Sequence, residues 1–306
     1  MSPLEAALSD YLRLRRSLGH QLDDAGRQLS RFVVYLDEID AETVTMDAVL
    51  AFVFDPSLNP ASITPSRRAT SVRGFARYLS GIDAATEIPP AGLVSYRSQR
   101  RTPHLFSDDD VAALVRHARA STPFPFRAET LATLIQLLVV SGMRVGEALR
   151  LDLSDIDWDN SVILIRNTKF HKGRDLPVSA STIEALAAYA ARHDRPRPAV
   201  MRLFVSLAGT PVIYTNFQTT FHAAVETAGI GQGSAIWPRI HDVRHSFAVR
   251  TVLGWHRAGL DVEALLPRLS TYLGHRDPRF TYHYLTATPE LLGYAAARLA
   301  AWTVTP

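Results

Sequence analysis

The 306-residue sequence contains no cysteine. This absence excludes disulfide bonds, thiol catalysis and zinc sites built on cysteine. The sequence also lacks an apolar run of the roughly 20 residues that a membrane-spanning helix needs. Glu5 and Asp10 interrupt the stretch in which a signal peptide has its apolar core. We therefore expect a cytoplasmic location and no membrane partner.

Lysine is almost absent as well. Only two of the 33 basic residues are lysines, Lys169 and Lys172, and both lie in one four-residue segment. An ammonium group can give up a proton, whereas a guanidinium group effectively cannot. The pair therefore suggests a place where a proton is transferred, although chance retention in an exposed loop explains two lysines equally well.

Neither sign of charge is in large excess. The first 100 residues hold 11 basic and 12 acidic residues and the remainder holds 22 and 18, so the net charge is +3. A bulk charge of this size does not argue for nucleic-acid binding, and such an argument has to come from local clusters. With 47% hydrophobic and 21% charged residues, the composition is that of a folded globular protein.

The length predicts two domains rather than one. Apolar residues recur at helical spacing over residues 1–88, so we expect an all-helical domain there. Residues 89–105 combine proline, glycine and arginine and are expected to form a basic interdomain linker. Residues 106–306 are expected to be mainly helical with a small antiparallel sheet, made by strands over 161–166 and 175–178. The predicted fold class is therefore mainly α, with a mixed α+β second domain.

Capping residues and breaks in the apolar pattern set the expected helix boundaries. The dipeptide Ser141-Gly142 interrupts a long apolar helix over residues 129–149. Further helices are expected over residues 66–79, 183–191, 215–228, 242–258, 262–272 and 289–302.

Most of the reactive side chains lie in five short segments, in the order Ser141–Glu147, Thr168–Arg174, His241–His245, Leu273–His275 and Tyr284. In order and spacing, this set resembles the tyrosine recombinases of the phage integrase family over roughly residues 106–302. Residues 1–88 resemble, more loosely, the helical core-binding domain of that family. The resemblance implies two domains that close around duplex DNA, the second of them catalytic.

Two arginines are candidates for the phosphate-binding groups. Breaking a phosphodiester without a metal ion requires positive charge at its non-bridging oxygens, and a guanidinium offers paired donors that match two of them. Arg144 follows the Ser-Gly break, and Arg244 lies three residues after His241, so that both project from one helical face. Taken alone, Arg144 is better explained as an ordinary surface arginine paired with Glu147; the full set of segments favours the phosphate instead.

The resemblance assigns the remaining catalytic roles. It implies that Lys169 donates a proton to the leaving 5′ oxygen and that His241 and His275 contact the phosphate or assist proton transfer. It places the tyrosine nucleophile nine residues after His275, at Tyr284. Tyr282 lies about 200° away on a helix, so we expect it to pack instead.

A metal site is the alternative interpretation of the histidines. His241 and Asp242 resemble a metal-binding pair of the metal-dependent phosphohydrolases, and His245, His275 and Asp277 are possible further ligands. This alternative leaves Arg144, Lys169 and Tyr284 without a role, so we expect neither a metal nor another cofactor.

Further cations are candidates for the DNA contacts. They lie on the helix over 66–79, in the linker and in the turn between the two strands: Arg67, Arg68, Arg73, Arg77, Arg97, Arg100, Arg101, Lys172 and Arg174. Phosphate contacts of this kind make binding fall steeply with salt. A solvated helix face explains the first four equally well when they are considered alone.

The resulting hypothesis is a site-specific DNA recombinase that cleaves and rejoins DNA through a 3′-phosphotyrosyl intermediate. It implies a homo-tetramer on paired double-stranded DNA sites, in integration, excision or transposition, at the nucleoid of a bacterial-type cell. The helix over 289–302 is expected to pack on its own domain or to be exchanged between protomers. The alternatives are a type IB topoisomerase-like enzyme that relaxes DNA alone, and a DNA-binding protein that keeps the fold without cleaving.

Overall fold

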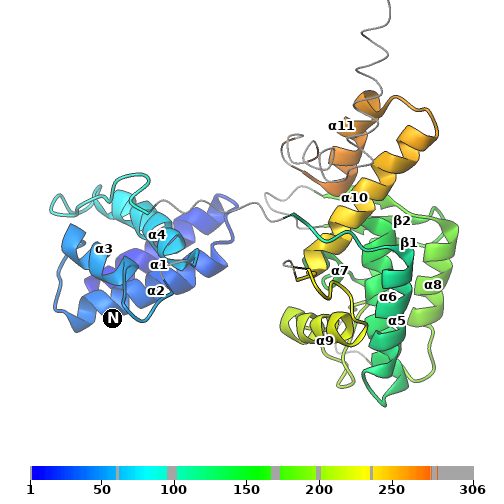
Figure 1. Cartoon of the computed structure of the whole chain (residues 1–306). Coiled ribbons are helices and arrows are strands. Elements are labelled where there is room, and N and C mark those ends of the chain that lie inside the picture. The colour runs from blue at the N-terminus through cyan, green and yellow to red at the C-terminus, as the bar shows by residue number, and fades with distance from the viewer. Residues whose placement is uncertain are drawn as a thin grey trace, which may run out of the picture. The chain divides into compact units, whose positions relative to one another are not determined.

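The computed structural model describes residues 2–59, 62–94, 102–166, 173–197, 201–234 and 237–275, together with 277 and 281. These residues fall into two compact units, one before residue 95 and one from residue 102 onward (Figure 1). Among the described residues, no helix is long and apolar enough to cross a membrane.

The first unit consists of helices packed around one apolar core. Its largest fully buried side chains include Phe32 and Phe75. Ser2 and Thr45 cap the first and third helices, because each side chain accepts a hydrogen bond from a backbone N–H of the first turn. The helices are α1 (Pro3–Ser17), α2 (Asp23–Glu38), α3 (Met46–Val53) and α4 (Thr64–Leu79).

The second unit is built around α6 (Pro125–Ser141), which is apolar on nearly every face and packs against α5 (Asp108–Ala120) and α10 (Ile240–Arg257) (Figure 1). Its other helical elements are α7 (Val145–Ala148), the 3-10 helix η1 (Leu153–Asp155), α8 (Ala180–Ala190), α9 (Tyr214–Thr227) and α11 (Val262–Leu273).

A three-stranded antiparallel sheet in the order β1-β2-β3 completes this unit. Its strands are β1 (Ile156–Asp157), β2 (Val162–Ile165) and β3 (Arg174–Pro177). Ile163 pairs with Leu176, and both are fully buried, so one face of the sheet lies on the core. The mainly helical fold with a small antiparallel sheet confirms the predicted fold class.

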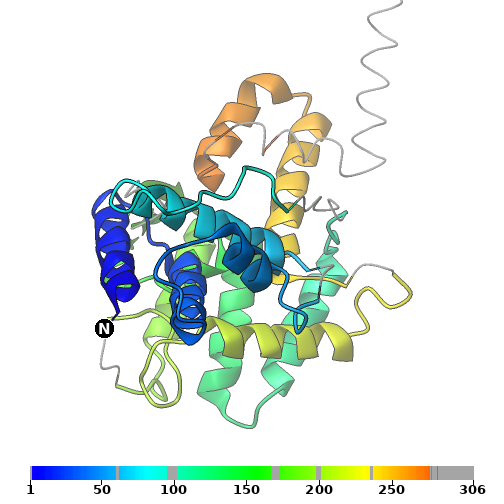
Figure 2. The same ribbon diagram turned by 90° about the vertical axis from the view of Figure 1, so that its left-hand side faces the viewer.

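Two features of the second unit position the candidate site. The apolar helix predicted over 129–149 is divided, because α6 ends at Gly142 in the left-handed conformation (φ +59°) and α7 begins three residues later. At one end of the unit, α11 packs on the C-terminal half of α10 through a small apolar cluster and ends at Gly274, also left-handed (φ +66°) (Figure 2). Both helix ends leave backbone carbonyls available as acceptors.

Candidate active site

Arg144 connects the turn after α6 to the turn after α11. Its Nη1 donates to Glu147 Oε1 at 2.8 Å, and its Nη2 donates to the carbonyl oxygen of Gly274 at 2.9 Å. The predicted alternative, an i,i+3 pair with Glu147, is therefore present, but it is only one of two contacts. The Arg144 side chain remains 41% exposed, so its head can also meet a ligand.

Arg244 joins the same two turns from the side of α10. Its Nη1 donates to the carbonyl oxygen of Gly142 at 2.8 Å and its Nη2 to that of Leu273 at 2.6 Å. The residue is only 2% exposed. The two candidate arginines thus bond neighbouring carbonyls of one short segment, Leu273 and Gly274, immediately before His275.

The residue Gly142 makes this convergence possible. A Cβ atom at this position would lie 2.3 Å from Cδ1 of Phe247 on α10, and its positive φ is one that side chains with a Cβ rarely adopt. Glycine therefore lets α10 approach the end of α6 closely enough for Arg244 to reach the carbonyl of Gly142.

His241 and His275 lie in this cationic environment. Burial, together with the positive charges of Arg244 and Arg144, lowers the pKa of His275 to about 4. Burial and Arg244 likewise lower the pKa of His241, although Asp242 opposes them. His275 Nδ1 is 2.8 Å from the hydroxyl oxygen of Thr281, and the His241 ring meets that of His245 edge-on at 4.8 Å between centroids. Both candidate histidines are therefore neutral at neutral pH.

A buried carboxylate, Glu147, lies behind Arg144. Its side chain is 4% exposed and accepts hydrogen bonds from Arg144 and from both Nη atoms of Arg174, at 3.1 and 2.8 Å. Burial acts to raise the pKa of Glu147, but Arg174 and Arg144 outweigh it and hold the pKa at about 2. Glu147 is therefore ionised and shared between two guanidinium groups.

Arg174 does not occupy the position that we expected of a DNA contact. Its side chain is only 10% exposed, and besides Glu147 it donates from Nε to the carbonyl oxygen of Tyr272 at 2.8 Å. Each nitrogen of the guanidinium is therefore engaged inside the protein. The strand β3 points this side chain inward, toward the end of α11, so this placement does not present the guanidinium at the surface, where we expected a phosphate contact.

Tyr272 is close to the site but is packed. Its ring stacks on Phe247 at 5.7 Å between centroids and its hydroxyl donates to the carbonyl oxygen of Pro177 at 3.3 Å. Burial raises the pKa of Tyr272 to about 12, although Arg174 opposes the shift. A phenol that is this hard to ionise is a poor nucleophile.

Several predicted site residues lie outside the described residues. They are the catalytic candidates Lys169 and Tyr284, the neighbouring Tyr282, the DNA-contact candidates Arg97, Arg100, Arg101 and Lys172, and the helix expected over 289–302.

The four arginines of α4 differ in their surroundings. Arg67 and Arg77 are exposed, while Arg73 is half-buried and donates to the carbonyl oxygen of Pro89 at 2.9 Å. Arg68 is buried: it donates to the carbonyl oxygen of Phe52 and pairs with Asp55. The DNA contact that we expected of Arg68 does not fit this placement, because helical periodicity turns its side chain into the core of the first unit.

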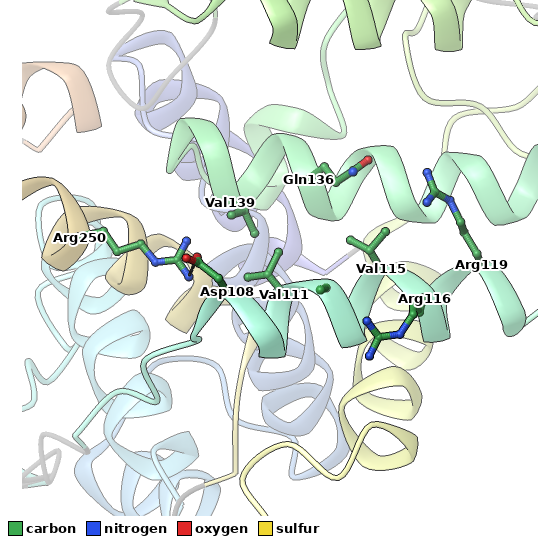
Figure 3. Close-up of a pocket in the computed structure, with 9 residues that line it drawn as sticks. Asp108, Val111, Val115, Arg116, Arg119, Gln136, Val139 and Arg250 are labelled. Carbon is green, nitrogen blue, oxygen red and sulfur yellow. Dashed lines mark ion pairs between the residues drawn. The ribbon is translucent and has the colours of Figure 1, made fainter. Parts of the chain in front are cut away.

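Two further observations concern ligands. Among the residues that the structure describes, no three histidine or acidic residues are grouped so that they could hold a metal ion. A groove of about 460 Å³ runs between α5 and α6, with the Asp108–Arg250 ion pair (3.0 Å) at one end (Figure 3). Of the predicted site residues that the structure describes, none lines this groove.

Sequence reasoning recognised the arginines and histidines but missed what holds them. Glu147 entered only as a rival partner of Arg144, and Gly274 only as the middle residue of the segment Leu273–His275. The available signal for Glu147 was its i,i+3 spacing from Arg144 inside a segment already singled out. No local signal connected Arg174 to Glu147, because their contact forms only in the folded chain.

This fold and this cluster of two arginines and two histidines define the class of the tyrosine recombinases, which act on DNA. The sequence profile of the phage integrase family matches residues 105–290, and the chain belongs to that family. A putative integrase/recombinase, y4rB of Sinorhizobium fredii (strain NBRC 101917 / NGR234), is 39% identical over 310 residues, 98% of each chain.

Solved structures share the fold. The integrase of the Tn1549 transposon in complex with transposon right end DNA has a TM-score of 0.62 at 17% identity, covering 96% of this chain and 99% of that one. The lambda integrase tetramer bound to a Holliday junction has a TM-score of 0.61 at 16% identity, covering 92% and 76%.

Proposed function

We propose that this chain is a site-specific recombinase that cleaves and rejoins DNA through a 3′-phosphotyrosyl intermediate, with Tyr284 as the nucleophile. The observation that carries the proposal is the convergence of Arg144 and Arg244 on the carbonyls of Gly274 and Leu273, next to His275. Three segments far apart in the sequence thereby meet at one point. Family membership supports recombination as the overall activity.

In the proposed reaction, the phenol oxygen of Tyr284 bonds to the phosphorus as the bond from phosphorus to the 5′ oxygen breaks. Arg144 and Arg244 stabilise the charge that develops on the non-bridging oxygens. Lys169 gives a proton to the leaving 5′ oxygen. His241 and His275 are neutral at neutral pH, so each can accept a proton from the phenol or donate a hydrogen bond to a phosphate oxygen. The reverse steps rejoin the DNA without an external energy source.

The assembly that we propose is a homo-tetramer on two double-stranded sites, in integration, excision or transposition of cytoplasmic DNA. Residues 1–88 and 106–306 act as the two jaws, joined by the linker 89–105, and residues 289–302 pack on their own catalytic domain or on a neighbour. The similarity in fold to the tetrameric lambda integrase supports this assembly. Arg67 and Arg77 are exposed on α4 and suit phosphate contacts. Arg73, Arg97, Arg100, Arg101 and Lys172 remain proposed contacts.

A nicked DNA duplex tests the proposal. The duplex is first selected from a random pool by repeated rounds of binding to the protein, and a nick is then placed so that the short 5′-hydroxyl strand diffuses away and traps the covalent product. Wild type and Tyr282→Phe should give a protein-linked band on a denaturing gel, and Tyr284→Phe should give none.

The other outcomes separate the rival functions. A band that survives in Tyr284→Phe contradicts the assignment of the nucleophile. Binding without any band identifies a DNA-binding protein that does not cleave. A band accompanied by relaxation of a plasmid without any selected site identifies a topoisomerase-like enzyme.

A further inference from the structure

The guanidinium group of Arg174 is enclosed by the protein. Arg174 is the first residue of strand β3, and its side chain is only 10% exposed, so its positive charge lies inside the protein and not at the surface. Nη1 and Nη2 donate to the two oxygens of Glu147 at 3.1 and 2.8 Å, and Nε donates to the carbonyl oxygen of Tyr272 at 2.8 Å. A paired, two-pronged contact of this kind fixes direction as well as distance.

Glu147, held in this orientation by Arg174, also holds Arg144. The same carboxylate accepts from Arg144 Nη1 at 2.8 Å and from the Arg144 backbone N–H at 2.9 Å. Both oxygens of Glu147 are therefore shared between Arg174 and Arg144. Any displacement of Arg174 shifts the carboxylate, and with it one of the two contacts that hold the exposed head of Arg144.

Arg174 also contacts the turn before His275. Arg174 holds the carbonyl of Tyr272, while the next two carbonyls, those of Leu273 and Gly274, are held by Arg244 and Arg144. Three consecutive carbonyls at the end of α11 are thus each bonded to a different arginine. Gly274 leaves room for this arrangement, since a Cβ atom there would lie 2.7 Å from Arg174 Nη1.

We propose that Arg174 is a positioning residue for strand cleavage: through Glu147 and the Tyr272 carbonyl it orients Arg144 and the turn that presents His275 to the phosphate. The proposal rests on the proposed function, because it assigns Arg174 a part in that reaction. Arg174 touches no reacting atom in it. Its effect is on the rate of cleavage and not on the binding of DNA.

Stability alone does not account for such a residue. Ion pairs taken out of water contribute little net stability, because the loss of hydration offsets most of the attraction, and apolar pairs often replace them without loss. Lysine is also not equivalent to arginine here, since an ammonium cannot engage both oxygens of Glu147 and a backbone carbonyl with one planar group. The geometry therefore points to orientation of the site.

The test separates DNA binding from cleavage in three variants of the full-length protein. Arg174→Met removes the guanidinium but keeps much of the side-chain length, and Arg174→Lys keeps the charge. Arg119→Met is the matched control, because Arg119 forms a two-pronged pair with Glu129 (3.0 and 2.8 Å) that joins α5 to α6 outside the cluster of site residues. Dissociation constants for a selected DNA duplex and single-turnover rates of adduct formation on its nicked form are measured below the melting temperature of each variant.

A misplacement of about 1 Å in a catalytic group can cost roughly 100-fold in rate. We expect Arg174→Met to form adduct about 10- to 100-fold more slowly than wild type, with a DNA dissociation constant within about twofold. The rate of adduct formation by Arg174→Lys should lie between those of Arg174→Met and wild type. The rate of Arg119→Met should equal that of wild type. If Arg174→Met does not fold, Arg174→Lys alone must show slower adduct formation with a DNA dissociation constant within about twofold of wild type.

Each other outcome overturns the proposal in a distinguishable way. Wild-type rates in both Arg174 variants, while Tyr284→Phe forms no adduct, remove the positioning role and leave the proposed function intact. A loss of DNA affinity that matches the loss of rate makes Arg174 a DNA contact. If Arg119→Met forms adduct as slowly as Arg174→Met, the loss of rate is due to general destabilisation and not to positioning by Arg174. Absence of adduct in wild type overturns the proposed function and this inference together.

Discussion

The two candidate histidines are held in the neutral form by their surroundings. Burial is the largest cause for both, and the positive charge of Arg244 adds to it. A neutral imidazole can accept a proton at neutral pH, whereas an imidazolium cannot. In the proposed reaction the arginines therefore act twice: they offer positive charge to the phosphate, and they keep His241 and His275 neutral, so that either imidazole can accept a proton.

A dependence of stability on pH follows from His275. The pKa is about 4 in the folded protein against an ordinary 6.5, so between these values the unfolded chain binds more protons. The free energy of unfolding must then fall as the pH is lowered from about 6.5 toward 4. One pKa unit corresponds to about 1.4 kcal/mol. Since His275 is only half-buried, we discount the effect for solvent screening to about 1 kcal/mol between pH 6.5 and about pH 5.

Urea unfolding of wild type and His275→Gln at these two pH values checks this expectation. All four tryptophans, Trp158, Trp237, Trp255 and Trp302, follow residue 101, so their fluorescence reports on the second part of the chain. The variant should lose about 1 kcal/mol less than wild type on acidification. Equal losses in the two proteins would show that His275 titrates normally.

The two arginines should differ in what their removal does to stability. Arg144→Ala and Arg244→Ala should each slow adduct formation by about 10²–10³-fold, because each removes a charged donor from the phosphate. Arg244 is 2% exposed, and its loss leaves the carbonyls of Gly142 and Leu273 without this donor. We expect Arg244→Ala to lower the free energy of unfolding by about 1–3 kcal/mol, and Arg144→Ala by less. Wild-type cleavage in either variant would contradict the phosphate-binding role.

The secondary structure around the site could be predicted where the signal is local. Ser141-Gly142 marks the end of α6, Thr45 and Ser107 cap the helices that follow them, and a run of apolar, mostly β-branched residues marks β2. Elements of two to four residues, such as β1 and α7, are too short for a periodic pattern. The contacts of Arg174 could not be predicted at all, because Tyr272 lies 98 residues further along the chain.

Because α10 approaches the end of α6 closely, we expect replacement of Gly142 by alanine to destabilise the protein much more than the same replacement at Gly233. Gly142 and Gly233 both have positive φ (+59° and +78°), but only Gly142 would bring a Cβ atom against another residue, at 2.3 Å from Phe247. Strain costs about 1–3 kcal/mol at either position, and overpacking adds about 1–3 kcal/mol at Gly142 alone. Gly142→Ala should therefore melt at a clearly lower temperature than Gly233→Ala in tryptophan-monitored unfolding. Equal melting temperatures would mean that the packing of α10 on this turn does not constrain the site.

Binding of the complete protein to duplex DNA should depend on salt in proportion to its phosphate contacts. Each such contact contributes roughly 0.9 to the slope of the logarithm of affinity against the logarithm of salt concentration. The double variant Arg67→Ala/Arg77→Ala removes two exposed cations from α4, so we expect its slope to be smaller by about 2. Arg13→Ala is the control, because Arg13 is also exposed but lies on α1. A slope unchanged in the double variant would place the DNA elsewhere.

The most direct test of the proposed chemistry is to identify the amino acid that becomes linked to DNA. Wild-type protein is trapped on the nicked duplex, digested with nuclease and protease, and the nucleotide-bearing peptide is sequenced by mass spectrometry. The proposed function, in which Arg144, Arg244, His241 and His275 act on one phosphate, predicts a 3′-nucleotide attached to the phenol oxygen of Tyr284. A nucleotide on Tyr282, on Tyr272 or on any other side chain would contradict it.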